Sequence, residues 1–329
     1  MKAVKITGYG APEVLQLGEA PKPEPKANEL LIRVRASSVS AADTMMRKGT
    51  PRYARLFLGV RRPKNPIPGT VFAGEIEAIG SDVTQFRVGD AVFGESGIGF
   101  SAHAEYFCMS EDGVIALKPE QMSFEEAAPA CDGAVTSLNF LRELANVQAG
   151  QRVLINGAAG GLGTAAIQLA KHFGAEVTAV CSGRNAGMVR ELGADHVIDY
   201  TQEDFTKNGQ SYDVIYDTVG KRSYRESKGA LTRNGIYMSP VLSMPLLLQM
   251  LWTSKIGSKR AKFSATGLLP APVLRGMLGD IKALYEAKVV TTIIDRSYPF
   301  EEIVEAHRHV DTGHKRGNVV LSLGAESPD

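Results

Sequence analysis

Residues 153–163 read Val-Leu-Ile-Asn-Gly-Ala-Ala-Gly-Gly-Leu-Gly and predict a buried strand that turns sharply into a helix. The stretch opens with short apolar strand formers, and glycines crowd the turn. Residues 164–173 then show helical spacing, and Gly174 ends the helix. Glycine lets such a turn bend tightly, admit a pyrophosphate to the backbone and pack the helix against the strand. The stretch therefore predicts a phosphate site at a helix N-terminus, with a plain tight turn as the alternative.

The next predicted strand, residues 176–182, indicates which dinucleotide would bind. A site that prefers NADH usually ends this strand in Asp or Glu, which binds the ribose 2′-hydroxyl. Here the tip reads Ser182-Gly183-Arg184-Asn185 and contains no acid. A hydroxyl, a guanidinium and an amide suit a 2′-phosphate, which arginine can bind through two hydrogen bonds. We therefore predict NADPH as the cofactor; the alternative is that Arg184 is only a solvated loop charge.

The composition is that of an ordinary globular enzyme. The chain has 329 residues, of which 44% are hydrophobic, and a net charge of +1. That length allows two domains with their own cores, and the near-neutral charge gives no argument for a nucleic-acid partner. The first seven residues have a strand pattern rather than that of a targeting segment. Cys108, Cys131 and Cys181 lie far apart with no C-x-x-C pair, which predicts a reduced, cytoplasmic protein.

The hydrophobic pattern divides the chain. Residues 1 to about 125 are rich in short strands, Pro and Gly, whereas strands and helices alternate up to about residue 269. Such alternation predicts a doubly wound parallel sheet with right-handed crossovers. We expect further strands of this sheet at 196–200, 213–217 and 235–239, with a helix at 221–231.

Several motifs occur in a characteristic order along nearly the whole chain. They are residues 1–4, 68–75, 86–94, 103–106, 156–163, 192–200, 213–220 and 316–321. In these motifs the chain resembles the medium-chain dehydrogenase/reductase superfamily, specifically its zinc-less quinone oxidoreductase branch. The resemblance implies an α/β protein with two domains. A GroES-like, β-rich catalytic domain would comprise 1–125 and 270–329, and a Rossmann doubly wound parallel-sheet domain, 126–269, would bind NADPH, with the nicotinamide in the cleft between them.

The resemblance also implies the cofactor contacts by position. The backbone N–H groups toward the pyrophosphate would be those of Ala159, Gly160, Gly161 and Leu162. The 2′-phosphate would be surrounded by Ser182, Arg184 and Tyr200, although a tyrosine at a strand end often only packs. The residues near the nicotinamide and its ribose would be Thr136, Val219, Met238, Ser239 and Asn318. Asp132 stands where an apolar residue is expected.

Zinc-dependent members of this superfamily hold a catalytic zinc with Cys and His side chains. At the position of the first Cys this chain has Ser40, and Gly69-Thr70-Val71 replaces a Gly-His-Glu motif. Thr and Val cannot replace an imidazole ligand. His307 and His309 do not share a helix face, and with His314 they are expected to be solvated. We therefore predict no metal site; zinc-dependent alcohol oxidation is the alternative that bound zinc would support.

Without a Lewis acid, the predicted reaction is hydride transfer from NADPH to a quinone or an activated α,β-unsaturated carbonyl. A hydrogen-bond donor near the carbonyl oxygen would polarise such an acceptor. The resemblance implies Ser40, Asp43 and Tyr53 on the substrate side. Tyr53 is the best hydroxyl donor, whereas Asp43 fits a helix cap better than a proton carrier. The alternative is an NADPH-binding structural or regulatory protein with little turnover.

Three further segments carry expectations. Arg47–Lys64 interleaves cations with apolar residues and predicts a solvated loop with an apolar anchor, or a gate that attracts anionic acceptors. Pro240–Thr253 is strongly apolar but shorter than the roughly 20 residues that span a bilayer. We expect a buried or interfacial helix or a pocket roof there, ahead of membrane contact. Residues 261–266 are expected to extend the sheet across the axis of a homodimer, as in relatives.

Overall fold

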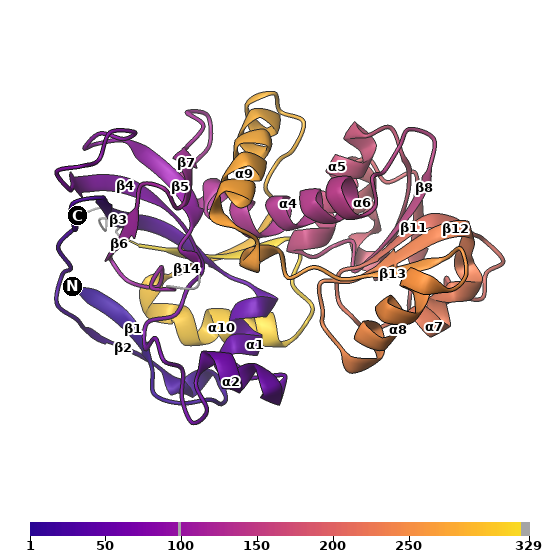
Figure 1. Cartoon of the computed structure of the whole chain (residues 1–329), viewed down its shortest axis with the longest axis horizontal. Helices are drawn as coiled ribbons and strands as arrows, with labels where there is room; N and C mark the ends of the chain where they lie inside the picture. Colours follow the sequence, from indigo (N-terminus) through magenta and orange to yellow (C-terminus); the bar gives the residue numbers. More distant parts are fainter. Residues whose placement is uncertain (98–99, 324–329) are drawn as a thin grey trace. The chain divides into compact units, whose positions relative to one another are not determined.

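The structure is a computed structural model that describes residues 1–97 and 100–323 (Figure 1). The chain divides into two compact units. Unit 1 contains Met1–Asp132, Pro270–Glu286 and the chain from Thr292 onward. Unit 2 contains Gly133–Leu269 and Ala287–Thr291. Residues 126–132, assigned from sequence to the cofactor domain, lie in unit 1 because the helix Phe124–Ala127 packs on its sheet.

Unit 1 is built on an almost wholly antiparallel sheet. Among the described residues, the strand order is β14-β15-β3-β4-β5-β7, β6 also pairs with β3, and β1 and β2 form a separate ribbon. The strands are β1 (Lys2–Ile6), β2 (Leu15–Glu19), β3 (Glu29–Val39), β4 (Val71–Ile79), β5 (Ala91–Glu95), β6 (Tyr106–Ser110), β7 (Val114–Leu117), β14 (Ile294–Pro299) and β15 (Asn318–Ser322). Alternate residues of β3, such as Leu30, Ile32 and Val34, enter the core of this unit.

The helices of unit 1 connect or cover these strands. They are α1 (Ala41–Lys48), α2 (Arg55–Leu58), α3 (Phe124–Ala127), α9 (Ala271–Glu286) and α10 (Ile303–Asp311), with single 3₁₀ turns at Pro12–Val14, Arg52–Ala54 and Phe300–Glu302. Helix α4 (Ala130–Leu138) begins in unit 1 and ends in unit 2.

Unit 2 is a parallel sheet with helices in its crossovers. In this described unit the strand order is β10-β9-β8-β11-β12-β13, and every pair is parallel. The strands are β8 (Arg152–Asn156), β9 (Glu176–Cys181), β10 (His196–Asp199), β11 (Tyr212–Asp217), β12 (Leu231–Met238) and β13 (Arg260–Lys262). The helices are α5 (Gly161–His172), α6 (Ala186–Glu191), α7 (Tyr224–Ser227) and α8 (Met244–Lys255), with a π-helical turn at Asn139–Leu144 and 3₁₀ turns at Gly183–Asn185, Lys228–Ala230 and Thr266–Leu268. The predicted doubly wound sheet is confirmed.

The helix expected at 221–231 is wrong in extent. Ser223 caps α7 through its side chain, so the helix starts at Tyr224 and is only one turn long. Leu231 already pairs with Tyr212 as the first residue of β12. Hydrogen bonds that fix the preceding loop hold residues 219–222 out of a helix.

Arg47 was expected in a solvated loop, but its side chain is fully buried in unit 1. Its guanidinium donates to the Gly10 carbonyl at 3.0 Å and to Asp311 Oδ2 at 2.5 Å. A buried charge needs such partners, because desolvation otherwise costs several kcal/mol. The start of the predicted loop, up to Lys48, is helix α1, and Arg47 faces inward from it.

The expectation that the C-terminal histidines are solvated is also wrong for His307. Its side chain is buried on the inner side of α10, and burial holds its pKa well below the usual value. His103 lies near it, with the ring centroids 6.4 Å apart, and burial lowers the pKa of His103 to about 4. His309 lies 3.1 Å from both the Tyr298 hydroxyl and Asp295, whereas His314 is exposed.

Candidate functional site

The predicted site residues divide between the two units. Ser40, Asp43, Tyr53 and Asn318 belong to unit 1. The remaining ones belong to unit 2, where most follow the carboxyl ends of parallel strands. Ligands of open α/β sheets bind at this edge, near the point where the strand order reverses. In unit 2 the order reverses between β8 and β11.

The glycine-rich turn between β8 and α5 is fixed by its backbone. Gly157 has φ +81°, a left-handed conformation that favours glycine. The amides of Gly157 and Ala158 both donate to the Val180 carbonyl, at 3.1 and 3.0 Å, and so tie the turn to the end of β9. A Cβ on Gly163 would lie 2.3 Å from the Gly157 carbonyl oxygen. The close helix–strand approach therefore depends on glycine at 163.

The first turn of α5 presents amides that the helix itself cannot use. The amide of Thr164 is the first to donate a helical hydrogen bond, to the Gly160 carbonyl at 2.9 Å. The amides of Ala159, Gly161 and Leu162 precede that bond, and no side chain caps this end. The Gly160 amide differs from the prediction, because it already donates to the Gly157 carbonyl at 3.1 Å. The turn thus offers N–H groups and a helix dipole to an anion.

Two other segments of unit 2 border this turn. On α4, which carries Thr136, the Ser137 hydroxyl donates to the Leu162 carbonyl at 2.9 Å, and a Cβ on Gly133 would lie 3.0 Å from the Gly161 carbonyl oxygen. After β11, the Thr218 hydroxyl donates to the Asn156 carbonyl at 2.8 Å. A Cβ on Gly157 would lie 2.9 Å from the Val219 side chain. The structure therefore brings α4, the turn and Val219 together.

The proposed 2′-phosphate residues lie after β9 and β10. Ser182 immediately precedes the 3₁₀ turn that carries Arg184, and the Arg184 side chain is exposed. Tyr200 follows β10 and is also exposed. Sequence reasoning missed Asp199, which pairs with Cys181 between β10 and β9. A Cβ on Gly183 would lie only 2.5 Å from a carboxyl oxygen of Asp199. Hydrogen bonds from Thr201 hold the pKa of Asp199 below its usual value. Only the strand pairing reveals this acid beside Ser182.

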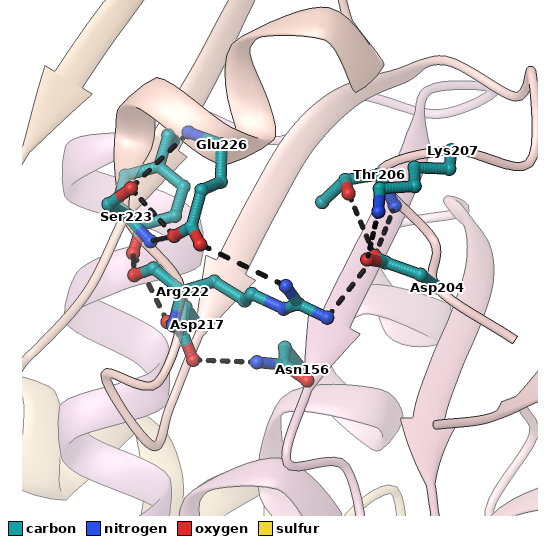
Figure 2. A network of polar contacts seen from close by, with 9 residues as sticks. Asn156, Asp204, Thr206, Lys207, Asp217, Arg222, Ser223 and Glu226 are labelled. Atoms are coloured by element: carbon teal, nitrogen blue, oxygen red, sulfur yellow. Dashed lines mark hydrogen bonds and ion pairs between the residues drawn. The ribbon is translucent and has the colours of Figure 1, made fainter. Parts of the chain in front are cut away.

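Asp217, at the end of β11, organises the loop that follows (Figure 2). Its fully buried carboxylate accepts hydrogen bonds from β8, from β12 and from its own loop. The donors are Asn156 Nδ2 at 2.9 Å, the amides of Val219, Gly220 and Arg222 at 3.3, 3.1 and 2.9 Å, and the Tyr237 hydroxyl at 3.1 Å. Arg222 in turn pairs with Asp204 at 3.2 Å. Asp217 therefore positions the loop that carries Val219.

We expect Asp217→Ala to lower the free energy of unfolding by about 3 kcal/mol or more, because it leaves several buried hydrogen-bond donors without an acceptor. The same substitution at Asp204, a partly exposed partner of Arg222, should cost only about 1 kcal/mol. Urea unfolding followed by circular dichroism measures both. Similar losses for the two variants would show that the Asp217 network does not hold the loop.

Met238 and Ser239, predicted beside the nicotinamide, lie at the end of β12 and are buried. The Ser239 hydroxyl accepts from the Val241 amide at 3.2 Å, and the Ser239 amide donates to Lys262 on β13 at 3.3 Å. A Cβ on Gly220 would lie 2.6 Å from Val241, so the loops after β11 and β12 touch.

In unit 1, Ser40 and Asp43 form a helix cap. The Ser40 hydroxyl accepts from the Asp43 amide at 3.2 Å, and Asp43 Oδ2 accepts from the Ser40 amide and hydroxyl at 2.8 and 2.7 Å. This reciprocal pair is a capping box at the start of α1. Burial raises the pKa of Asp43, and its other oxygen, Oδ1, has no hydrogen-bond partner among the described residues.

The other two site residues of unit 1 have separate surroundings. Tyr53 lies in the 3₁₀ turn Arg52–Ala54 and is 40% exposed. Asn318 begins β15, and its amide side chain donates to the Ile293 carbonyl at 3.0 Å.

Sequence reasoning missed a group of charges in unit 1. Burial raises the pKa of Glu95 to about 8, and repulsion from Asp132 and Asp43 contributes to this rise. Burial and the Asp43 charge raise the pKa of Asp132 to about 6, and burial lowers the pKa of Lys315 despite its attraction to Asp132. Asp132 was visible as a departure from an apolar pattern. Glu95, which pairs with Val71 at the end of β5, gave no sequence signal.

The described residues contain no group of three His, Cys, Asp or Glu side chains arranged to hold a metal ion. At the position of the first zinc ligand, the Ser40 hydroxyl donates to Asp43 within the helix cap. Thr70, at the second, supplies no nitrogen, sulfur or carboxylate donor of the kind that zinc prefers. The side chains present therefore do not fit a catalytic zinc.

Comparison with known proteins places this two-unit architecture in a family of oxidoreductases. The family described as "Alcohol dehydrogenase GroES-like domain" matches residues 26–119, and "Zinc-binding dehydrogenase" matches 192–321. The chain is 31% identical to 2-methylene-furan-3-one reductase of Solanum lycopersicum, over 98% of this chain and 79% of that protein. It is 30% identical to a mitochondrial NAD(P)H oxidoreductase of Bos taurus, over 98% and 89%.

Among solved structures, the quinone oxidoreductase from Coxiella burnetii matches with a TM-score of 0.87 and 32% identity, covering 98% of this chain and 99% of that one. The chain belongs to the medium-chain dehydrogenase/reductase superfamily, in its quinone-oxidoreductase-like branch. It is accordingly an NAD(P)H oxidoreductase.

Proposed function

We propose that this oxidoreductase uses NADPH, needs no zinc, and transfers hydride to quinones or activated α,β-unsaturated carbonyls. The observation that carries the proposal is the glycine turn of unit 2, whose uncapped helix N-terminus opens at the carboxyl edge of the parallel sheet. The acceptor class is supported by the similarity to a furanone reductase and a quinone oxidoreductase. The poor fit of the Ser40 and Thr70 side chains to zinc supports metal independence.

In this proposal, residues of unit 2 bind and orient the cofactor. The amides of Ala159, Gly161 and Leu162 would hold the pyrophosphate, and Ser182, Arg184 and Tyr200 the 2′-phosphate. Thr136, Val219, Met238 and Ser239 would border the nicotinamide and its ribose. When bound, NADPH supplies the hydride. The protein's own contribution is alignment, since hydride transfer depends on how closely donor and acceptor carbon approach.

Residues of unit 1 are proposed to serve the acceptor. The Tyr53 hydroxyl would donate a hydrogen bond to the acceptor oxygen as negative charge develops there. Ser40 and Asp43 would brace α1, and Asn318 would approach the nicotinamide from the C-terminal segment. The capping box that Ser40 and Asp43 form agrees with this bracing role.

We expect Arg184→Ala to weaken NADPH binding by about ten- to a hundredfold and NADH binding much less, because only NADPH carries the 2′-phosphate. Titration calorimetry with both cofactors measures the two dissociation constants. Arg190→Ala, which removes another exposed cation of unit 2, is the control and should change neither value. Equal losses for NADPH and NADH in Arg184→Ala would refute the 2′-phosphate assignment.

Turnover tests the reaction itself. With NADPH and benzoquinone, phenanthrenequinone or a small enone, we expect cofactor oxidation that a metal chelator does not reduce. Tight cofactor binding without turnover on any acceptor would favour a structural or regulatory protein. Loss of turnover on chelation, together with zinc found by elemental analysis, would overturn the metal-independent mechanism.

We further propose a homodimer in a reducing compartment such as the cytoplasm. The short strand β13 lies at the edge of the unit 2 sheet, where a second copy could continue it. Cys108, Cys131 and Cys181 are all free thiols, which agrees with a reducing environment.

A further inference from the structure

Helix α8 carries apolar side chains on two opposite faces. On one face, Leu246 is buried in the core of unit 2 and Met250 packs against it. Thr253, on the same side, is buried and its hydroxyl accepts from the Ala261 amide on β13 at 3.0 Å. This face fixes the helix beside the edge strand of the sheet (Figure 1).

The opposite face of α8 is apolar but exposed. Met244, Leu248, Leu251 and Trp252 are 59%, 63%, 70% and 65% exposed. Their spacing places them within an arc of about 100° on the helix surface. Soluble proteins rarely leave such a cluster of large apolar side chains uncovered, so the face indicates an interaction surface.

The segment of sequence that carries this face is cationic. Between residues 227 and 269 the sequence contains no Asp or Glu. The same stretch contains the cations Lys228, Arg233, Lys255, Lys259, Arg260 and Lys262. Lys255 falls within the exposed apolar arc, and Ile256, 52% exposed, extends it.

We propose that the exposed face of α8 docks on a membrane surface with anionic headgroups. Leu248, Leu251 and Trp252 would enter the boundary between headgroups and acyl chains, and Lys255 would face the headgroup phosphates. The segment that carries α8 is cationic and contains no acid, so it complements anionic lipid. The proposal is independent of the acceptor chemistry above.

The helix would lie in the plane of the surface rather than cross it. Its 12 residues extend about 18 Å, against a hydrocarbon core of about 30 Å. Consistently, no helix in the described part of the chain combines the length and hydropathy that crossing requires. Lys255 at the end of the helix and Lys259 shortly after it fit an interfacial helix, whose polar flanks stay at the headgroups.

Trp252 is the single tryptophan of the chain, so intrinsic fluorescence reports on this face directly. The full-length protein is titrated with vesicles of pure phosphatidylcholine, and with vesicles of equal parts phosphatidylcholine and phosphatidylglycerol. We expect a blue shift of the emission and co-sedimentation with the anionic vesicles, and little of either with the neutral ones. High salt should weaken the binding.

Matched variants test which residues bind. Leu248→Gln/Leu251→Gln should weaken binding to anionic vesicles by at least about tenfold, and Lys255→Gln by roughly fivefold. Val88→Gln, which replaces an apolar residue 60% exposed in unit 1, is the control and should bind as the parent does. Circular dichroism checks that each variant is folded, which is expected because all four positions are exposed.

Three results would overturn the proposal. The first is no binding to either vesicle. The second is binding that the Leu248→Gln/Leu251→Gln variant retains. The third is a Trp252 blue shift that depends on protein concentration without lipid and disappears in that variant, which would assign the face to a second copy of the chain.

Discussion

Replacing Gly163 with alanine is expected to weaken NADPH binding by at least about tenfold and to destabilise unit 2 by about 1–3 kcal/mol. The new methyl carbon would lie 2.3 Å from the Gly157 carbonyl oxygen and 2.6 Å from the backbone of Ala158. These obstacles are backbone atoms that are themselves held by β9, so they cannot move aside as a flexible side chain could. The helix must therefore shift away from the turn, and its first amides shift with it.

Gly187→Ala provides a matched control in the same unit. Gly187 lies in α6 with an ordinary backbone conformation, and nothing lies within 4 Å of its Cβ position. Alanine there should stabilise the protein by up to about 1 kcal/mol, because glycine loses more backbone entropy on folding. Thermal unfolding and calorimetric titration of NADPH measure both variants. If Gly163→Ala bound NADPH as tightly as Gly187→Ala, the turn would not be the pyrophosphate site.

The glycine turn was predictable because its information is local. A strand, a tight turn and a helix each have a signal within a few residues, and the glycines are explained by one close approach. The cap at Ser40 and Asp43 was predictable for the same reason, since capping residues lie three positions apart. Both features depend only on residues that are close together in the sequence.

The missed features depend on residues that are distant in the sequence. Asp199 meets the Ser182 loop only because β10 pairs with β9 in a particular register. Asp43 and Asp132 repel the charged form of Glu95 only because the fold brings these three residues near one another. The pairing of β4 with β5 and the start of α4 place them there. The sequence could not show that one face of α8 is exposed, because an apolar helix has the same sequence pattern whether one side or both are covered.

Arg47 and Asp311 are 264 positions apart, and no local pattern could pair them. Because Arg47 is fully buried, we expect Asp311→Ala to lower the free energy of unfolding by about 3–5 kcal/mol. The guanidinium would keep only the Gly10 carbonyl as a partner of those described above. A buried charge that loses its counter-ion is among the costliest single changes in a protein.

Replacing Arg47 instead of Asp311 should lower the free energy of unfolding less. Arg47→Met removes the buried charge and keeps much of the side-chain volume, and Asp311 retains Lys48 at 2.7 Å near the surface. We expect a loss of about 1–2 kcal/mol, mainly from the unpaired Gly10 carbonyl. The double variant Arg47→Met/Asp311→Ala should then be more stable than Asp311→Ala alone, because no unpaired charge remains in the core. Urea unfolding of the three variants tests this ordering. Additive losses would mean that the two side chains do not depend on each other, and that water reaches the Arg47 guanidinium when Asp311 is removed.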